Sequence, residues 1–412
     1  MRIIILGSGL MGPAAAFNAM SDPEVKQVTI CDVSQARLDA CLAALSGLAG
    51  AEKLDAVVLD LSDPEGAARA LAGGDAVIAA LPRPVSALAA QAALRAGLPL
   101  VDLSLLAEDQ RAQLAAEAEA AGGLVVTGCG LEPGLTEIVT RYLAEKLDRV
   151  DEVHIKCGGI PANPTSPLGY KIVFGGRQLP VRERDACIVE DGALQAVPRY
   201  SGAEPMTVEG VGECEAWHEG FMPWLLDLPA LEGLRLGTQK TVRWPGYAAK
   251  MSWLKELGLL SLEPVMVDGV PVAPKRLLDA VLYPRLKMDP AQGDRDITVF
   301  RVEVKGERAG HPLRYQCDMV DFYDEALGFT SMARTTAFTG AIVARMIAHG
   351  ALMPAPGLYS PEKLVTGEAF KRLVDELAAV NIRFKITSEQ VETLQLSSTG
   401  HQRTPASNPW AT

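Results

Sequence analysis

A glycine-rich segment near the N-terminus carries the clearest chemical pattern in the chain. Gly7-Ser8-Gly9-Leu10-Met11-Gly12 directly follows an apolar run at residues 3–6 and opens an alanine-rich stretch of helical composition. In such a strand-to-helix turn, Gly7 permits the tight turn, Gly9 lets the backbone approach a pyrophosphate, and Gly12 lets the helix lie close to the strand. The helix N-terminus adds N–H donors and a positive dipole end, so the segment predicts dinucleotide binding.

An acidic residue follows at the spacing that this motif requires. Asp32 lies twenty residues after Gly12, at the end of the apolar run 28–31. A carboxylate there accepts a hydrogen bond from a ribose 2′-hydroxyl and repels a 2′-phosphate, which favours NAD over NADP as the cofactor. The alternative is a glycine-rich turn of an α/β fold that binds no cofactor.

Two further segments follow apolar runs and would meet the same edge of a sheet. Leu81 and Pro82 come directly after the run at 76–80, and we expect this loop to pack beside the nicotinamide; the alternative is an ordinary proline-stiffened loop. Asp102 ends the next run, within reach of the nicotinamide end. Its alternative role is that of a helix N-cap together with Ser104.

The densest glycine cluster of the chain surrounds a third acidic residue. Glu132 lies within Gly128-Cys129-Gly130-Leu131-Glu132-Pro133-Gly134, right after the apolar run 124–126. At a crossover between domains, this carboxylate would bind a substrate ammonium or exchange protons with it, with a pKa tuned by burial. Alternatively, Glu132 caps a helix that begins near Pro133.

Short apolar runs alternate with helix-compatible stretches through the first third of the chain. Because the runs are apolar on both faces, they indicate buried parallel strands with helices on both sides. They lie at residues 3–6, 27–31, 56–59, 76–80, 100–103 and 124–126. The expected fold is α/β, with a Rossmann-type doubly wound parallel sheet over residues 1–127.

The pattern changes after residue 127. Alternating or β-rich segments at 152–156, 241–243, 296–304 and 314–320 predict a second α/β domain with a mixed sheet over residues 128–330. Apolar residues at helical spacing in 331–349 predict C-terminal helices, within 331–396, that pack back onto the first domain. Residues 397–412 are Ser/Thr/Pro/Asn-rich and predict a mobile tail.

Composition excludes several classes of protein. The 412 residues are 48% hydrophobic and 22% charged, as in globular proteins, and the net charge of −12 disfavours nucleic-acid binding. We expect no membrane partner, because no window offers the roughly 20 apolar residues of a span. The seven cysteines contain no C-x-x-C pair, and this predicts a cytoplasmic protein. The His and Cys residues lack the spacing of zinc ligands, so we predict no metal site.

Several segments together resemble the saccharopine dehydrogenase-like oxidoreductases, in a layout most similar to lysine 6-dehydrogenase. The resemblance runs from residue 1 to about residue 370. Besides the segments with Gly7–Gly12, Asp32 and Glu132, it rests on Cys157-Gly158-Gly159-Ile160-Pro161, Pro167-Leu168-Gly169-Tyr170-Lys171, Val242-Arg243-Trp244-Pro245-Gly246-Tyr247, Met332-Ala333-Arg334-Thr335-Thr336-Ala337 and Tyr359-Ser360-Pro361-Glu362-Lys363-Leu364-Val365.

The resemblance implies an active site in the cleft between two domains and a homodimer whose interface is formed largely by the second sheet. It also implies hydride transfer from a carbon that bears nitrogen to the nicotinamide, followed by hydrolysis of the imine. Glu132 and Cys157 fall where saccharopine reductases carry an acid/base carboxylate and a thiol. Tyr170, Lys171, His218 and Arg243 are expected to face the substrate.

Each of these residues has a structural alternative. Cys157 suits a small buried hydrophobic position, Arg243 a surface strand charge, and Tyr170 a packed ring. Asp32 favours the lysine-type branch, whereas Cys157 and the Tyr170-Lys171 segment are more similar to the saccharopine type.

The resulting hypothesis is an NAD-dependent dehydrogenase that acts on a small amine. It oxidises the ε-carbon of lysine, or of an N-substituted lysine such as saccharopine, to 2-aminoadipate semialdehyde. The alternatives are a carboxynorspermidine-type polyamine dehydrogenase and a non-catalytic NAD-binding regulator.

Overall fold

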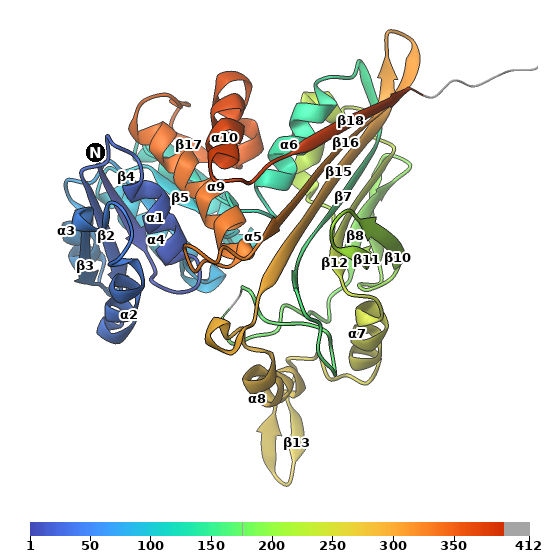
Figure 1. Ribbon diagram of the computed structural model, residues 1–412, viewed down its shortest axis with the longest axis horizontal. Helices are drawn as coiled ribbons and strands as arrows, with labels where there is room; N and C mark the ends of the chain where they lie inside the picture. The colour runs from blue at the N-terminus through green and yellow to red at the C-terminus, as the bar shows by residue number, and fades with distance from the viewer. Residues whose placement is uncertain (175, 391–412) are drawn as a thin grey trace, which may run out of the picture.

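Two β-sheets with helices between them form the computed structural model of the protein, which describes residues 1–174 and 176–390 (Figure 1). The tail predicted at 397–412 lies outside the described residues. The element order places the second sheet between two parts of the chain that contribute to the first.

The first sheet is parallel throughout, with the order β17-β6-β5-β4-β1-β2-β3. Its central strand shows why a parallel sheet forms, since Ile3, Ile4 and Ile5 point to alternate faces and all are fully buried. The N-terminal strands are β1 (Arg2–Leu6), β2 (Gln27–Asp32), β3 (Leu54–Val58), β4 (Ala76–Ala79), β5 (Leu100–Asp102) and β6 (Leu124–Val126). The predicted Rossmann-type doubly wound sheet is confirmed.

Helices connect these strands on both faces of the sheet. They are α1 (Gly12–Met20), α2 (Gln35–Leu45), α3 (Pro64–Leu71), α4 (Ser86–Arg95) and α5 (Glu108–Ala120). Helix α1 is rich in alanine, and its Ala14, Ala15 and Ala16 are fully buried. Small side chains let α1 lie close to the sheet and to the C-terminal helix α9 (Ser331–Ala348).

The second sheet is mixed, as predicted, and its long strands run diagonally in Figure 1. Strand β7 (Arg149–Pro161) pairs in parallel with β12 (Leu236–Arg243) and antiparallel with β15 (Asp296–Arg308). The other strands are β8 (Ala186–Glu190), β9 (Ala193–Val197), β10 (Glu204–Val208), β11 (Gly212–His218), β16 (His311–Phe322) and β18 (Lys385–Gln390). Helices α6 (Leu135–Ala144) and α9 pack on β15.

The sequence predicts only helices for the C-terminal part, but the structure also contains strands there. Besides α9 and α10 (Gly367–Ala379), it contributes β17 (Gly357–Tyr359) to the first sheet and β18 to the second. β17 has only three residues, too few for a periodic pattern, and β18 is exposed along its whole length. A solvated edge strand shows none of the apolar alternation on which strand prediction depends.

A smaller helical part projects from the second sheet. It contains α7 (Tyr247–Glu256), the hairpin of β13 (Val265–Val267) and β14 (Val270–Val272), and α8 (Pro274–Leu286). The hairpin forms a separate two-stranded sheet at the lower end of the molecule in Figure 1.

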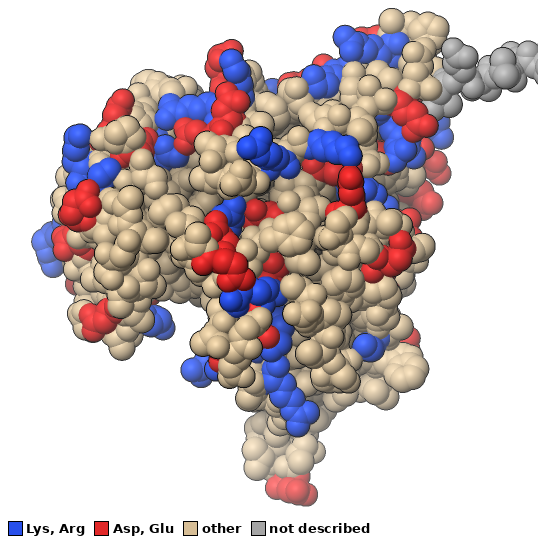
Figure 2. Space-filling view, viewed as in Figure 1, with Lys and Arg blue, Asp and Glu red and all other residues tan. Residues whose placement is uncertain are grey.

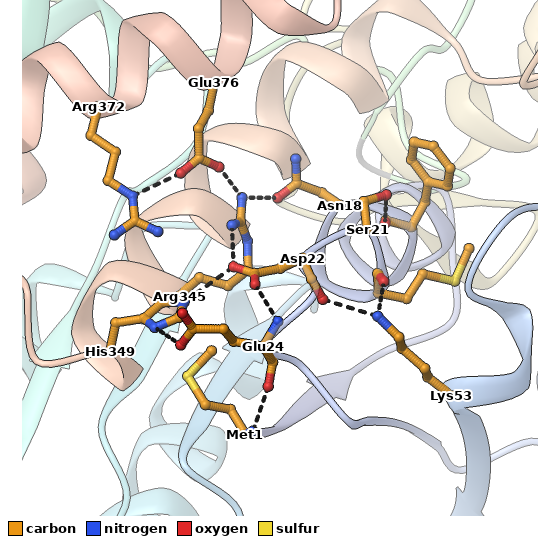
Figure 3. Close-up of polar contacts among 12 residues, drawn as sticks. Met1, Asn18, Ser21, Asp22, Glu24, Lys53, Arg345, His349, Arg372 and Glu376 are labelled. Atoms are coloured by element: carbon orange, nitrogen blue, oxygen red, sulfur yellow. Dashed lines mark hydrogen bonds and ion pairs between the residues drawn. The ribbon is translucent and has the colours of Figure 1, made fainter.

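A buried polar network fastens α9 and α10 to the end of α1 (Figure 3). Arg345 of α9 donates to Asp22 at 2.8 Å and to Asn18 at 3.0 Å, and it also pairs with Glu376 of α10. His349 lies 3.1 Å from Asp22. Burial acts to raise the pKa of Asp22, but hydrogen bonds and the nearby positive charge outweigh it and lower the pKa to about 2.

No helix in the described part of the chain combines the length and the apolar character that a membrane crossing requires. All seven cysteines carry unpaired thiols, and six of them are buried.

Candidate functional site

The phosphate loop has the shape that a dinucleotide needs. A Cβ on Gly7, whose φ is +97°, would lie 2.5 Å from Ala80 O, and one on Gly12 would lie 2.1 Å from Gly7 O. A Cβ on Gly9 would meet nothing within 4 Å, so this glycine leaves open space above the turn. Close packing at Gly7 and Gly12, together with open space at Gly9, fits a pyrophosphate held by the N-terminus of α1.

Asp32 closes one side of this loop. Its Oδ2 accepts from Ser8 N at 3.0 Å and from Ser8 Oγ at 2.8 Å, while its Oδ1 accepts from Ser34 N at 2.9 Å and from Arg37. Burial raises the pKa of Asp32, but the Arg37 bond and these N–H donors lower it to about 2 overall. The carboxylate is therefore ionised and placed at the end of β2, where a ribose would lie.

The remaining loop residues predicted to bind the cofactor lie at the same edge of the sheet. Leu10 is 49% exposed and Met11 is half-buried before α1. Leu81 is half-buried close to Gly7, and Pro82 is exposed at the start of a short turn. All four follow β1 or β4, whose carboxyl ends are adjacent.

Asp102 is fully buried at the end of β5. Its Oδ1 accepts from Ser104 N at 2.8 Å and Ser104 Oγ at 3.0 Å, whereas its Oδ2 has no hydrogen-bond partner in the part of the chain that the structure describes. Burial raises the pKa of Asp102 to about 6. Helix α5 begins only at Glu108, so Asp102 stabilises the turn after β5 and does not cap that helix.

The glycine cluster after β6 turns the chain toward the second sheet. Gly134 has a φ of +134°, and a Cβ there would lie 2.3 Å from Gly130 O, so the turn accepts only glycine. Gly128 N donates to Ser104 O and Cys129 N to Asp102 O, which ties this loop to the end of β5. Glu132 is thereby held where the carboxyl edge of the first sheet faces the second.

Glu132 joins two residues that the sequence did not single out. Gln239 of β12 donates from Nε2 to Glu132 Oε1 at 2.9 Å and to Glu137 Oε1 at 3.0 Å. Its own Oε1 accepts from Met222 N at 3.2 Å, which fixes the orientation of the amide. Helix α6 starts after Gly134, and Glu137 rather than Glu132 accepts the N–H of that cap residue. Glu132 is therefore not a helix cap.

The surroundings of Glu132 and Glu137 raise the pKa values of both carboxyl groups. Burial raises the pKa of Glu132 to about 8, with further increases from the charges of Glu137 and Glu219 and opposing effects from Gln239 and Arg243. Burial also raises the pKa of Glu137. A carboxyl group that titrates near neutral pH is suited to accepting a proton from an amine and returning it.

Cys157 lies in the middle of β7, fully buried and close to the same carboxylates. Burial, then the charges of Glu132 and Glu137, hold the pKa of its thiol well above the usual value. The two glycines after it serve packing: a Cβ on Gly158 would lie 2.7 Å from Arg243 Nη1, and one on Gly159 would lie 2.5 Å from Met332 Cε. The thiol is thus a neutral neighbour of Glu132 at neutral pH.

Arg243 is 4% exposed, so it is not the surface charge that the sequence left open as an alternative. Its guanidinium lies 4.8 Å from the centre of the Tyr170 ring and 5.9 Å from that of Tyr247. Nη1 donates to Val242 O, but Nε has no partner among the described residues, and neither do Tyr170 Oη and Trp217 Nε1. Three buried polar groups without partners in one aromatic cluster indicate a place for a polar ligand.

The other two predicted substrate residues lie outside this cluster. His218 follows Trp217 in β11 and pairs with Lys240 of β12, so its side chain lies on the opposite face of the sheet from the Trp217 ring. His218 is half-buried, its Nδ1 has no partner among the described residues, and burial, followed by the charge of Lys240, lowers its pKa to about 4. Lys171 donates to Asp294 at 2.8 Å in an ion pair. The structure therefore brings neither side chain into the aromatic cluster.

A group of arginines borders the same region. Glu219 pairs with Arg182 at 2.7 Å and with Arg199. Burial and the charges of Arg182, Arg199 and then Arg83 lower the pKa of Arg184. Because Arg83 belongs to the loop after β4, positive side chains from both sheets approach one another here.

Among the described residues, no group of three His, Cys, Asp or Glu side chains is arranged to hold a metal ion. Among the hollows of the described surface, one lies over residues 226–235 and another over the outer face of the mixed sheet, and Glu132 lines neither of these.

Glu137, Gln239 and Glu219 are the polar residues of this region that sequence reasoning missed. Gly134-x-x-Glu137 is a recognisable start of a helix, which explains the position of Glu137 but not the donor that it shares with Glu132. Gln239 lies in a strand with no pattern that distinguishes it. Gln239 reaches both carboxylates because β12 lies against the loop after β6 and the start of α6, a tertiary arrangement that no local signal predicts.

Two family models match consecutive parts of the chain. The Saccharopine dehydrogenase NADP binding domain matches residues 3–126, and the Saccharopine dehydrogenase C-terminal domain matches residues 130–382. The predicted resemblance to this family, and the predicted binding of a nicotinamide dinucleotide, are confirmed at this level.

Known proteins of related sequence cover the chain in part. The mitochondrial alpha-aminoadipic semialdehyde synthase of Bos taurus is 24% identical over 377 aligned residues, which cover 73% of this chain and 40% of that protein. Carboxyaminopropylagmatine dehydrogenase of Synechocystis sp. is 22% identical over 256 residues, covering 59% of this chain and 61% of that protein. The chain thus spans 61% or less of the length of these relatives.

A solved structure shares the whole fold. Apo saccharopine dehydrogenase (L-Glu forming) from Saccharomyces cerevisiae superposes with a TM-score of 0.77 at 19% sequence identity, covering 94% of this chain and 99% of that chain. The C-terminal family model alone spans more than half of the 412 residues, and the N-terminal model spans the first sheet. The chain therefore belongs to the saccharopine dehydrogenase family of NAD(P)-binding oxidoreductases.

Proposed function

We propose that the protein oxidises a C–N bond of an amino acid, at the ε-carbon of L-lysine or of an N-substituted lysine such as saccharopine. The observation that carries this proposal is the position of Glu132. It lies between the two sheets, hydrogen-bonded to Gln239, with its pKa raised to about 8 by burial and neighbouring charge.

The proposed reaction needs a proton acceptor and a hydride acceptor. Glu132 takes a proton from the substrate nitrogen. A nicotinamide dinucleotide held by residues Gly7–Gly12 would supply the acceptor for the hydride, with its two electrons, that leaves the carbon bearing this nitrogen. The carbon–nitrogen double bond that results is hydrolysed by water to the semialdehyde. Cys157 is a neutral neighbour that excludes water from one side of Glu132, and Asp102 stabilises the turn behind the site rather than transferring the proton.

We propose NAD as the preferred cofactor. Residues Gly7–Gly12 would hold its pyrophosphate, and Leu81 and Pro82 would lie beside the nicotinamide. Asp32 is ionised and directed by Ser8 toward the phosphate loop, which supports a ribose with a hydroxyl rather than a phosphate at its 2′ position. Arg37, bonded to the same carboxylate, supports residual binding of NADP.

Arg243, Tyr170 and the arginines at the margin would bind the carboxylates of the substrate. Arg243 presents a buried Nε without a partner, and a guanidinium binds a carboxylate through two parallel hydrogen bonds. Arg83, Arg182 and Arg184 add positive charge beyond it. This excess of positive charge supports a substrate with more than one carboxylate, such as saccharopine, over free lysine. We place His218 outside the substrate site, because it pairs with Lys240 on the opposite face of the sheet, and we give Lys171 a structural role, because Asp294 engages it.

A polyamine substrate is the second candidate. The acidic groups Glu132, Glu137 and Glu219 lie near aromatic rings, an environment that also suits a cationic amine. The relative from Synechocystis, named carboxyaminopropylagmatine dehydrogenase, is consistent with a carboxylated polyamine in this position.

The seven unpaired cysteines support a reducing compartment, which we propose is the cytoplasm.

Reduction of the cofactor by a panel of amines tests the proposal. The purified chain is given NAD with lysine, saccharopine or carboxynorspermidine, and with alanine as an amine that lacks the long side chain. We expect reduced cofactor with saccharopine or lysine and none with alanine. If no amine yields reduced cofactor while NAD binding is measurable, a non-catalytic NAD-binding regulator replaces the enzyme.

A further inference from the structure

Glu219 directly follows strand β11 and lies opposite Gln239 of β12. Its backbone N donates to Gln239 O at 3.1 Å, which continues the register that pairs Trp217 with Thr241. Side chains alternate along a strand, so Glu219 lies on the same face of the mixed sheet as Trp217. Gln239, Thr241 and Arg243 alternate in the same way along β12. The face that carries the candidate site therefore carries Glu219 as well.

The carboxylate of Glu219 has one engaged oxygen and one available oxygen. Arg182 donates to Oε1 at 2.7 Å, and Arg199 pairs with the same atom. Among the described residues no group donates a hydrogen bond to Oε2, and the Glu219 side chain is 20% exposed. Arg199 is also held by the backbone, because its Nε donates to Arg184 O at 2.8 Å. The two arginines therefore fix the carboxylate while leaving Oε2 open to a donor.

The charge of Glu219 reaches the groups of the candidate site. Burial, and then charges that include that of Glu219, raise the pKa of Glu132. Burial also raises the pKa of Tyr170, where the charges of Arg243 and Glu219 act in opposite directions. Because the Coulomb energy falls with distance, both charges lie close enough to Tyr170 to act on a ligand beside this ring.

The charge of the whole surface does not account for selection of a ligand. In Figure 2, acidic and basic side chains are interspersed over the face shown. The net charge of −12 attracts cations without distinguishing them, and salt screens it beyond about 10 Å. Discrimination between ligands of similar size must come from particular atoms. Glu219 Oε2 and Arg243 Nε, which has no partner among the described residues, are two such atoms.

We propose that Glu219 binds the α-ammonium group of an amino-acid substrate while Arg243 binds the α-carboxylate of the same head group. This inference rests on the proposed function and adds to it the residue that distinguishes an α-amino acid from a simple amine. An ammonium group donates to Oε2, and a guanidinium donates to a carboxylate through parallel hydrogen bonds. Since an α-amino acid carries both groups on one carbon, an acceptor and a guanidinium beside one ring match it. Glu132 is left for the nitrogen at the other end of the substrate.

A purely structural role for Glu219 predicts a different result. As a counter-ion of Arg182 and Arg199 alone, Glu219 would affect every ligand alike, through the shape of the site. As the acceptor for an ammonium group, it affects only those ligands that carry this group. The ratio of affinities for two ligands that differ by the ammonium group separates the two roles, because both ligands report on the same folded protein.

Calorimetric titration of the full chain measures this ratio, with NADH bound so that no ligand is oxidised. The ligands are lysine, 6-aminohexanoate, which lacks the α-ammonium group, and 1,5-diaminopentane, which lacks the α-carboxylate. The variants are Glu219→Gln and Arg243→Gln. Glu303→Gln is the matched control, because Glu303 also pairs with two cations, Arg314 and Lys305, and is 14% exposed on the outer face of the same sheet.

The wild type and Glu303→Gln should bind lysine about 10- to 100-fold more tightly than 6-aminohexanoate, the range expected for a hydrogen bond between charged groups. Glu219→Gln should bind these two ligands with similar affinity and keep the preference for lysine over 1,5-diaminopentane. Arg243→Gln should lose the latter preference. If Glu219→Gln does not fold, Glu219→Asp, which withdraws the carboxylate by one bond, should also lower the first ratio.

A wild type that does not bind lysine, or that binds lysine and 6-aminohexanoate equally, overturns the proposal. So does a ratio that neither substitution of Glu219 changes. Failure of the proposed function gives a different result. If the expected preferences are observed but no reduced cofactor forms when NAD replaces NADH, recognition of the head group by Glu219 stands, and oxidation of the amine does not.

Discussion

Gln239 joins Glu132 to Glu137, with its Nε2 at 2.9 Å from one carboxylate and 3.0 Å from the other. One amide nitrogen therefore donates to two acidic side chains that come from the loop after β6 and from helix α6. Because an amide N–H stabilises an ionised acceptor while two nearby negative charges repel, Gln239 and Glu137 act on Glu132 in opposite directions.

Replacement of Glu132 by glutamine should lower kcat far more than it changes the affinity for NAD. Glutamine keeps the size of the side chain but cannot accept the proton, and loss of a general base typically costs about 10²–10⁴-fold in rate. Steady-state kinetics and NAD titration measure the two effects. Glu119→Gln, at an exposed position of α5, serves as the control. An unchanged kcat in Glu132→Gln removes this residue from the chemistry.

The pH dependence of amine oxidation should report the Glu132 carboxyl. Since the ionised form is the base, kcat/KM should rise with pH and level off above about 8, the pKa of Glu132. Glu137→Gln removes a repelling charge and should shift the inflection to lower pH, whereas Gln239→Leu removes a stabilising donor and should shift it to higher pH. Shifts in the same direction for both variants contradict this arrangement.

Asp32→Ala should weaken NAD binding by about 10-fold or more without a comparable loss for NADP. The change removes an acceptor for the ribose hydroxyl and a charge that repels a 2′-phosphate, while Arg37 remains. Fluorescence titration with both cofactors gives the ratio of affinities. Asp39→Ala, exposed on the same helix as Arg37, should leave this ratio unchanged. Equal losses for NAD and NADP would show that Asp32 acts only on loop structure.

Asp22→Asn should destabilise the protein in a way that depends on pH. The folded pKa of Asp22 is about 2, below its ordinary value of 3.8, so the ionised form stabilises the fold above pH 3.8, and this stabilisation is lost as pH falls toward 2. At pH 7 we expect the free energy of unfolding to fall by about 2 kcal/mol, since one pKa unit corresponds to about 1.4 kcal/mol.

Urea unfolding of wild type and Asp22→Asn at pH 7 and near pH 3 measures this difference. The gap between the two proteins should narrow at the lower pH. Asp109→Asn, exposed on α5, is the matched control and should show little change at either pH. A gap that stays constant with pH would show that the Arg345 contact stabilises through packing rather than charge.

The first sheet was predictable because its signals are local. The apolar strands, the three glycines of the phosphate loop and the spacing to Asp32 all lie within short windows of sequence. Each expresses a backbone requirement that few residue types satisfy. Strand β17 escaped prediction because its three residues gain their order only from β6, far away in the chain.

The candidate site was predictable only in part. Glu132 and Arg243 were identified through their motifs, but Gln239 and Glu137 meet Glu132 through strand pairing and helix packing across long stretches of sequence. The burial of Arg243 beneath aromatic rings has the same origin. Such contacts depend on tertiary structure. Nothing in the sequence distinguishes a polar strand residue that will face a buried carboxylate from its polar neighbours in the same strand.

Transfer of deuterium from substrate to cofactor tests the central claim most directly. Saccharopine and lysine that carry deuterium at the ε-carbon are each incubated with the protein and NAD, and the reduced cofactor is analysed by mass spectrometry. We expect one of them to yield reduced cofactor carrying one deuterium, and Glu132→Gln to form it far more slowly. Reduced cofactor without deuterium from either substrate, or none at all from a protein that binds NAD, would contradict hydride transfer from this carbon.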